Sequence, residues 1–312
     1  MFFRVTSQMQ ANDAIAYMQQ QSSALAAVQG QVSSGIQLQV PSDNPVGYTT
    51  LAQAQTASLQ YATYNQTITN ATSTLSSSSS ALQNVNNILT QAKTAATQGA
   101  DATTGSTGYQ ALAIQVNGLI SEMMTNANTS VGGSYLFSGT ASNTQPFQVT
   151  ATDANGDPTA ISYNGSSSAG QALIGPGQTV NTEYAGSQVF QQTGADVFQA
   201  LINLRNNLTN PTLTQSQNSM SQALNQSLSD ISSAATAIQN VMGEQGSNMA
   251  TLGSVQTQVQ NLQLAANTQA SNVSSTDYTS AIVQMQEQET ALQASMTVSS
   301  KILQPSLMNF IQ

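Results

Sequence analysis

Two long stretches of the chain repeat apolar residues every seven positions, a pattern typical of helices that pack along a seam. The first stretch covers residues 44–98, and its apolar series is Ala54, Tyr61, Ile68, Leu75, Leu82 and Leu89. A companion series three residues before each of these is mostly small or polar: Leu51, Ser58, Asn65, Thr72, Ser79 and Asn86. We therefore expect one helix over 44–98 whose seam is half apolar and half polar.

The start of this helix is marked by the sequence Pro41-Ser42-Asp43-Asn44-Pro45. An Asp or Asn side chain caps the free N–H groups of a helix start, and proline suits the first turn because no donor is needed there. No further proline occurs before Pro146. About 55 residues that rise 1.5 Å each would form a rod of roughly 80 Å. A rod with a single apolar edge needs a partner of equal length.

The second stretch, over residues 210–274, has the properties of that partner. Its seven-residue series is Leu224, Ile231, Ile238, Gln245, Leu252, Val259, Ala266 and Val273. Its companion series is Leu228, Ala235, Met242, Met249, Gln256, Gln263 and Ala270. Two rods of matched length that are joined by an insert most simply fold back antiparallel.

Both ends of the chain carry narrower stripes that bury little area. The N-terminal stripe, which Gly35 ends, is Ile15, Met18, Ser22, Leu25, Gln29 and Val32. The C-terminal stripe, which we expect Pro305 to end, is Tyr278, Ile282, Met285, Glu289, Leu292, Met296, Ser299 and Leu303. We expect the two helices to lie side by side and to become ordered against partners. An ordinary amphipathic helix packed on its own domain is the alternative for the N-terminal one.

The segment between the rods changes in composition. A helix is expected through Leu112–Met123, and a β-rich insert follows from residue 134 to about 194, where three of the seven prolines lie. Asn155-Gly156 marks a hairpin tip, and Gly175-Pro176-Gly177 marks a second turn. A further helix is expected from Asp196 to Leu208.

These elements predict a mainly α fold with a small β-rich insert, in which the N- and C-terminal halves form long antiparallel helical rods. We expect three domains. Residues 1–40 and 275–312 form paired terminal polymerisation helices, 41–131 and 210–274 form the rod, and 132–209 form a β-rich outer domain with a following helix.

The composition excludes several kinds of chemistry. The 312 residues contain no cysteine, histidine or tryptophan, so disulfides, thiolate or imidazole catalysis and His- or Cys-ligated metals are absent. Four basic residues against 13 acidic ones leave no phosphate-binding surface, which argues against nucleic acid. No apolar run reaches the roughly 20 residues of a membrane span, and we expect no membrane insertion. The N-terminus lacks a signal-peptide pattern, so the protein is either cytosolic or exported without a cleaved signal.

Charged residues make up only 5% of the chain. A nearly neutral surface avoids like-charge repulsion when identical subunits stack, and assembly would then depend little on salt. An acidic habitat explains the missing charge equally well. The sequence leaves both explanations open.

Few residues have the spacing of a reactive site. Asp153-x-Asn155-x-Asp157 has the opening spacing of a calcium loop, but Pro158 and Asn164 stand where that loop needs Gly and Glu. A plain hairpin turn is the simpler interpretation. Glu287 and Glu289 are two apart on a helix and point in different directions. We expect no catalytic residue, no metal and no cofactor, and hence no enzyme.

Three motifs in order along the chain match a known family. They are Gln31-Val32-Ser33-Ser34-Gly35 with Pro41–Gly47, then Gly132–Thr140 with Pro146-Phe147, and finally Asp277-Tyr278 through Phe310. On these residues the chain resembles the flagellin superfamily of bacterial flagellar axial proteins. It is most similar to junction proteins of the hook-associated protein 3 type, because flagellins usually lack the two prolines at 41 and 45.

The resemblance implies a structural role at the junction of hook and filament. It implies export through the flagellar type III apparatus, an extracellular location and assembly as a ring through the terminal helices. The implied partners are further copies of the chain, the preceding hook-associated junction protein, flagellin and an export chaperone. Flagellin itself, or another type III-secreted coiled-coil protein, is the alternative. The expected assembly residues are Ile15, Met18, Leu25, Val32, Pro41, Ser42, Asp43, Pro45, Ile282, Met285, Leu292, Leu303, Leu307 and Phe310.

Overall fold

The computed structural model describes residues 7–42, 44–101, 104–210 and 216–308. The helices are α1 (Ser7–Ser34), α2 (Pro45–Ala100), α3 (Ser106–Ala127), α4 (Gly186–Phe190), α5 (Val197–Thr209), α7 (Gln217–Ser274) and α8 (Tyr278–Met308). The strands are β1 (Ser130–Val131), β2 (Ser134–Tyr135), β3 (Phe147–Thr152), β4 (Pro158–Tyr163), β5 (Gly170–Gly175), β6 (Gln178–Glu183), β7 (Gln191–Gln192) and β8 (Ala195–Asp196). Each strand pairs antiparallel with its sequence neighbour. The predicted fold, mainly α with a small β insert, is confirmed.

The chain divides into two compact units. One consists of residues 1–60 and 262–312, and the other of residues 61–261. Each unit is built from both halves of the chain, because the two longest helices, α2 and α7, contribute to both.

The helix ends mostly follow the capping signals. The Asn44 carboxamide oxygen accepts a hydrogen bond from the N–H of Gly47 at 2.9 Å, and α2 begins at Pro45 as predicted. Helix α1 ends at Ser34, just before Gly35, which has the positive φ of 70° that suits a helix stop. The prediction that Pro305 ends the last helix is wrong, since α8 continues to Met308. A proline removes one hydrogen-bond donor from a helix and crowds one carbonyl. Only three residues of α8 follow Pro305, so few helical hydrogen bonds depend on it.

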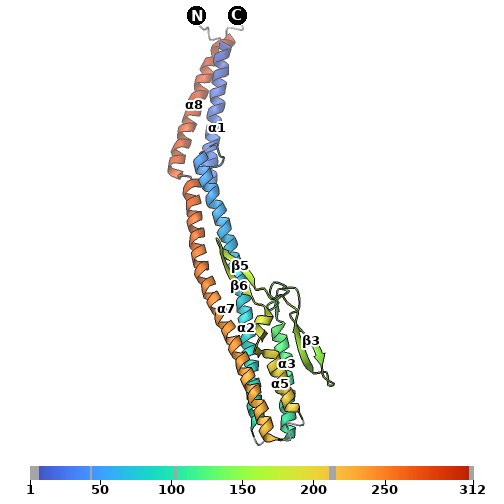
Figure 1. The fold of residues 1–312 in the computed structure, drawn as a ribbon. Coiled ribbons are helices and arrows are strands. Elements are labelled where there is room, and N and C mark those ends of the chain that lie inside the picture. The colour runs from blue at the N-terminus through green and yellow to red at the C-terminus, as the bar shows by residue number, and fades with distance from the viewer. Residues whose placement is uncertain (1–6, 43, 102–103, 211–215, 309–312) are drawn as a thin grey trace. The chain divides into compact units, whose positions relative to one another are not determined.

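In the unit of residues 61–261, α2 and α7 lie side by side (Figure 1). Hydrogen bonds join Asn65 to Gln256 at 3.4 Å, Ser78 to Gln245 at 2.7 Å and Asn86 to Gln239 at 3.5 Å. Partner numbers fall as the first numbers rise, so the helices are antiparallel, as predicted. The predicted apolar series is also buried: Ile68, Leu75 and Leu82 are fully buried in one core cluster with Ile238, Leu252 and Val259.

The companion series in α2 differs from the prediction by one residue. The buried positions are four residues before the apolar series: Tyr64, Ala71, Ser78, Val85 and Ala92. The predicted positions Asn65, Ser79 and Asn86 lie at the half-buried flank of the seam. Spacings of three and four both satisfy a seven-residue period, so the period alone does not choose between them. The seam is therefore more apolar than predicted, and its polar pairs lie mainly along its edge.

One polar pair lies inside this seam. Gln245 is fully buried, Ser78 is 1% exposed, and the Gln245 side-chain nitrogen donates to the Ser78 hydroxyl. The Gln245 side-chain oxygen has no hydrogen-bond partner. A buried polar group in a helical seam costs stability but disfavours other registers.

We predict that Ser78→Ala lowers the free energy of unfolding by about 1–3 kcal/mol, because it leaves the whole buried amide of Gln245 unpaired. The double variant Ser78→Ala/Gln245→Met should regain most of that loss, since both partners are then apolar. Urea denaturation of the four proteins in the cycle measures this coupling. Additive effects of the two substitutions would contradict the pairing.

The β-rich part packs on α3 and α5 around a cluster of aromatic rings. Phe147 lies 5.0 Å from Phe198 and 5.3 Å from both Phe190 and Tyr163, measured between ring centroids. The amide of Asn128 holds the start of β3, because it accepts from the Phe147 N–H at 2.9 Å and donates to the Phe147 C=O at 3.0 Å. This side chain thereby continues the pairing pattern of a strand.

The predicted hairpin and the predicted second turn are confirmed, and the second turn also closes a hairpin. In the first, Phe147 pairs with Tyr163 and Val149 with Ile161, and Gly156 occupies the turn with a φ of 88°. In the second, Gly175 pairs with Gln178 around the Pro176-Gly177 turn. The calcium-like triplet lies in the first turn, where the Asp153 carboxylate accepts from the N–H groups of Asn155 and Asp157, both at 2.9 Å.

These hydrogen bonds predict a pH-dependent turn. The N–H of Asp157 lowers the pKa of Asp153 below 3.8, aided by the N–H of Asn155 and the charge of Arg205 and opposed by desolvation. A carboxylate with a lowered pKa stabilises the folded turn above its unfolded pKa, and that contribution is lost as the pH falls through the folded value. Amide hydrogen exchange at Asn155 and Asp157 should therefore accelerate below pH 3.8 beyond its intrinsic pH dependence. The Asp153→Asn variant should lack this acid transition, and an identical transition in both proteins would contradict the assignment.

Candidate assembly interface

Helices α1 and α8 pair in the unit that contains both chain ends (Figure 1). Short backbone contacts close one end of the pair: Ile36 bridges Ser275, and the N–H of Gln37 donates to the Ser274 C=O at 2.7 Å. The N–H of Thr276 donates to the Gly35 C=O at 3.0 Å. The predicted side-by-side arrangement of the two terminal helices is confirmed by these contacts.

The inner seam of this pair consists of small, polar and medium-sized residues. Half-buried positions in α1 recur four and three apart: Ala14, Met18, Gln21, Leu25, Val28 and Val32. Buried or half-buried positions in α8 do the same: Ala281, Met285, Gln288, Leu292, Ser295 and Ser299. The side-chain oxygens of Gln21 and Gln288 are buried and have no hydrogen-bond partner. The seam therefore mixes apolar contacts with unpaired polar groups.

Several large apolar side chains lie outside this seam. Ile15 is 44% exposed and Tyr17 67% on α1, while Ile282 is 42%, Met296 50% and Val298 55% exposed on α8. We call Ile15, Ile282 and Met296 the outer apolar face. Tyr17 and Val298 lie two residues along the helix from Ile15 and Met296 and point in other directions. Exposed apolar residues that recur along a helix pair rimmed by polar residues are typical of a protein-binding surface. The geometry leaves these apolar side chains available to a partner.

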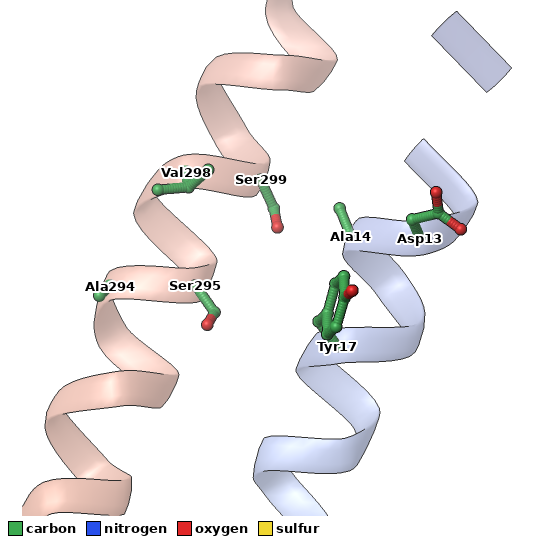
Figure 2. A pocket seen from close by; sticks show the side chains of 7 residues that line it. All are labelled: Asp13, Ala14, Tyr17, Ala294, Ser295, Val298 and Ser299. Atoms are coloured by element: carbon green, nitrogen blue, oxygen red, sulfur yellow. The ribbon is translucent and has the colours of Figure 1, made fainter. Parts of the chain in front are cut away.

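A groove of about 490 Å³ runs between the two helices. In Figure 2, Ser295 and Ser299 point from α8 toward α1, and Ala14 and Tyr17 lie opposite them. Val298 forms part of the same lining, so the groove carries the exposed Tyr17 and Val298 but none of Ile15, Ile282 and Met296. Its lining is small and mostly apolar, with one carboxylate at Asp13.

The structure places the predicted assembly residues in two groups. Met18, Leu25, Val32, Met285 and Leu292 belong to the inner seam, whereas Ile15 and Ile282 belong to the outer apolar face. Pro41, Ser42 and Pro45 are exposed at the start of α2. Asp43, Phe310 and the side chains of Leu303 and Leu307 lie outside the described residues. The role of all these residues in assembly stays a prediction.

Sequence reasoning missed Tyr17 and Val298, and it treated both series of each terminal stripe as one assembly surface. The series that contain Ile15 and Ile282 lie outside, and the positions one residue earlier are inside. In α8, the smaller Ala281 is buried and the larger Ile282 is exposed. This reverses the usual preference for large apolar residues in a core.

The described residues show few features of other kinds of site. None of their helices has a segment long and apolar enough to cross a membrane. Within the same residues, no three acidic side chains gather in a way that could hold a metal ion.

Comparison with known proteins agrees with this architecture. Residues 5–142 match the family model of the bacterial flagellin N-terminal helical region. Over these residues the chain is similar to the N-terminal helical region of bacterial flagellin. No curated protein sequence matches it. The match to the family model covers α1, α2, α3 and the entry to the β-rich part. It therefore includes one of the two helices of the candidate assembly interface.

Several solved structures share the fold of this chain at low sequence identity. A putative flagellar hook-associated protein from Vibrio parahaemolyticus has a TM-score of 0.64 at 18% identity, covering 75% of this chain and 100% of that one. The flagellar junction protein FlgL from Legionella pneumophila has a TM-score of 0.59 at 16% identity, covering 72% and 100%. Flagellar hook associated protein-3 from the same species gives 0.64 at 16%, covering 71% and 98%.

Proposed function

We propose that this protein joins the flagellar hook to the filament as a structural ring. The single observation that carries the proposal is the outer apolar face, which the paired terminal helices leave exposed. Burial of apolar surface drives protein association, and further copies of the chain offer the same face. The likeness in fold to proteins named as hook-associated or junction proteins supports the particular position in the flagellum.

The proposal includes the partners that such a position requires. They are further copies of the chain, a preceding hook-associated junction protein, flagellin and an export chaperone. The protein would leave the cell through the flagellar type III apparatus and work outside it, without catalysis. Residues 1–40 and 275–312 would form the polymerisation domain, 41–131 and 210–274 the rod, and 132–209 the outward-facing domain.

A filament subunit is the second candidate, because the matching family model is that of flagellin. The two roles differ in self-assembly. A filament subunit polymerises into long filaments by itself, whereas a junction protein stays monomeric or forms short rings until it meets a hook.

A deletion strain tests the proposal. We expect cells without this protein to build hooks, to release flagellin into the medium and not to swim. Electron microscopy of purified protein, alone and with isolated hooks, should show short caps on hooks and no free filaments. Long filaments from the protein alone would favour the flagellin role and overturn the junction role.

A chain that lacks residues 280–312 should fail to cap hooks while the unit of residues 61–261 stays folded.

A further inference from the structure

The tip of the first hairpin lies over a cavity instead of packing on a core. A cavity of about 370 Å³ is bounded by α3, α5 and the β3–β4 turn. Ala113 and Asn117 of α3, Asp157 of the turn and Arg205 of α5 are among its lining residues. Asn155 and Gly156 at the turn are exposed, so the tip itself buries little surface.

A charged side chain forms one wall of this cavity. Arg205 is only 3% exposed, although it is one of four basic residues in a chain with a net charge of −9. Its Nε and Nη2 donate to the Asn206 carboxamide oxygen at 3.2 and 2.9 Å, and its Nη1 donates to the Asn117 carboxamide oxygen at 3.4 Å. The guanidinium is thus held by neutral amides. The acidic groups nearest to it on the facing turn are Asp157, which lines the cavity, and Asp153, whose carboxylate feels its charge.

Asn117 connects this guanidinium to the turn. Its side-chain nitrogen donates to the Asp157 carboxylate at 2.5 Å, while its oxygen accepts from Arg205. One amide therefore bridges a cation on α5 and an anion on the hairpin, and each charge strengthens the hydrogen bond that it shares with the amide. Among the described residues, this is the one hydrogen bond that the turn 153–157 makes outside its own hairpin.

The base of the hairpin is held differently. Phe147 is fully buried in the aromatic cluster, and the C=O of Ile161 accepts from the Gln191 side chain at 3.0 Å. The base is fixed by packing, and the tip by a single polar relay that crosses a cavity. A segment with few apolar contacts opens at lower free energy than the core beside it.

We propose that the β3–β4 turn is a strap over the α3–α5 cavity, latched by the relay Arg205–Asn117–Asp157. Breaking the relay opens the strap and exposes the cavity, while the helices and the base of the hairpin stay folded. The calcium-like spacing of Asp153, Asn155 and Asp157 then has a structural meaning, because Asp153 shapes the turn and Asp157 latches it. This device lies in the unit of residues 61–261 and is independent of the assembly interface.

A single engineered thiol measures the opening. The chain has no cysteine, so Ala113→Cys places one thiol at a cavity wall where the native side chain is 5% exposed. We compare its rate of reaction with a maleimide in the full chain with the rates after adding Asp157→Ala, Asn117→Ala or both. Glu122→Ala is the matched control, because it removes an exposed carboxylate from the same helix.

We expect Asp157→Ala and Asn117→Ala each to raise the labelling rate about tenfold, as the loss of a hydrogen bond to a charged group predicts. The labelling rate of the double variant should equal that of each single variant, since each substitution breaks the same relay. Glu122→Ala should leave the labelling rate unchanged. The circular dichroism melting curve should stay unchanged throughout. Unchanged labelling, or rates that multiply in the double variant, would overturn the latch. Relaxation of the Gly156 amide in proteins without the added thiol provides a second readout, with increased mobility expected in both relay variants only.

Discussion

The triple variant Ile15→Ser/Ile282→Ser/Met296→Ser should fail to assemble on hooks and yet fold like the native protein. The three side chains are 42–50% exposed in the monomer, so their loss costs the fold little. In an assembly they would become buried, and each would contribute about 1 kcal/mol from the half of its surface that is still exposed. Losing all three weakens association by about 3 kcal/mol, or roughly 100-fold. Electron microscopy of hooks incubated with increasing protein concentrations measures this change.

A matched control variant separates the loss of apolar side chains on the terminal helices from the loss of exposed apolar surface in general. The variant Val131→Ser/Val149→Ser/Leu173→Ser removes three apolar side chains that are 42–48% exposed in the β-rich part. It changes exposed apolar area by a similar amount but leaves the terminal helices intact. We expect it to cap hooks like the native protein. Equal loss of capping in both variants would show that the outer apolar face has no special role.

Phe147→Ala should lower the free energy of unfolding of the unit that contains it by about 3–5 kcal/mol, the range for large-to-small changes of a buried aromatic residue. Phe147 is fully buried, and its ring contacts those of Tyr163, Phe190 and Phe198. It also begins β3, and its backbone is held by the amide of Asn128. Truncation leaves a cavity where the hairpin meets α5, and the β-rich part then loses the packing that fixes its base.

Urea denaturation followed by far-ultraviolet circular dichroism measures the effect. Val149→Ala, two residues further along the same strand and 42% exposed, is the control and should change stability by less than about 0.5 kcal/mol. The contrary result is a loss below about 1 kcal/mol for Phe147→Ala, which would mean that the aromatic cluster does not hold the hairpin.

The long helices could be predicted from sequence because their signals are local and repeated. Asn44 and Pro45 mark a helix start, and Ile68, Leu75 and Leu82 repeat over several turns. Turn chemistry was equally informative, since Asn155-Gly156 tolerates the positive φ that the hairpin requires. These features depend on neighbours in the chain and need no knowledge of distant contacts.

The faces of the helices could be predicted only in part. A seven-residue period fixes one buried series, but the second lies either three or four residues away. In α2, the apolar character of Tyr64 and Val85 indicated the correct choice over Asn65 and Asn86. In α8, side-chain size indicated the opposite choice, because Ala281 and Ser295 face inward while Ile282 and Met296 face outward. In the proposed assembly, that reversal reflects a surface whose partner is outside the chain, and a pattern within one chain does not contain the partner.

The latch was beyond sequence reasoning for a related reason. Asn117, Asp157 and Arg205 come from a helix, a turn and another helix, and 88 residues separate Asn117 from Arg205 along the chain. Only the packing of α3 on α5 brings them together. The spacing of Asp153, Asn155 and Asp157 drew attention to the turn and was interpreted as a plain hairpin turn, but it contained no sign of the Asn117 amide.

Thiol labelling of the assembled protein tests the central claim most directly. A single cysteine at Ile282→Cys lies on the outer apolar face, and Gln148→Cys on the exposed side of β3 serves as the control. Both thiols should react with a maleimide at similar rates in the free protein. On hooks, the thiol at position 282 should become protected while the thiol at position 148 stays reactive. Equal reactivity at position 282 in the free and assembled protein would contradict the assembly of this chain through the outer apolar face of its terminal helices.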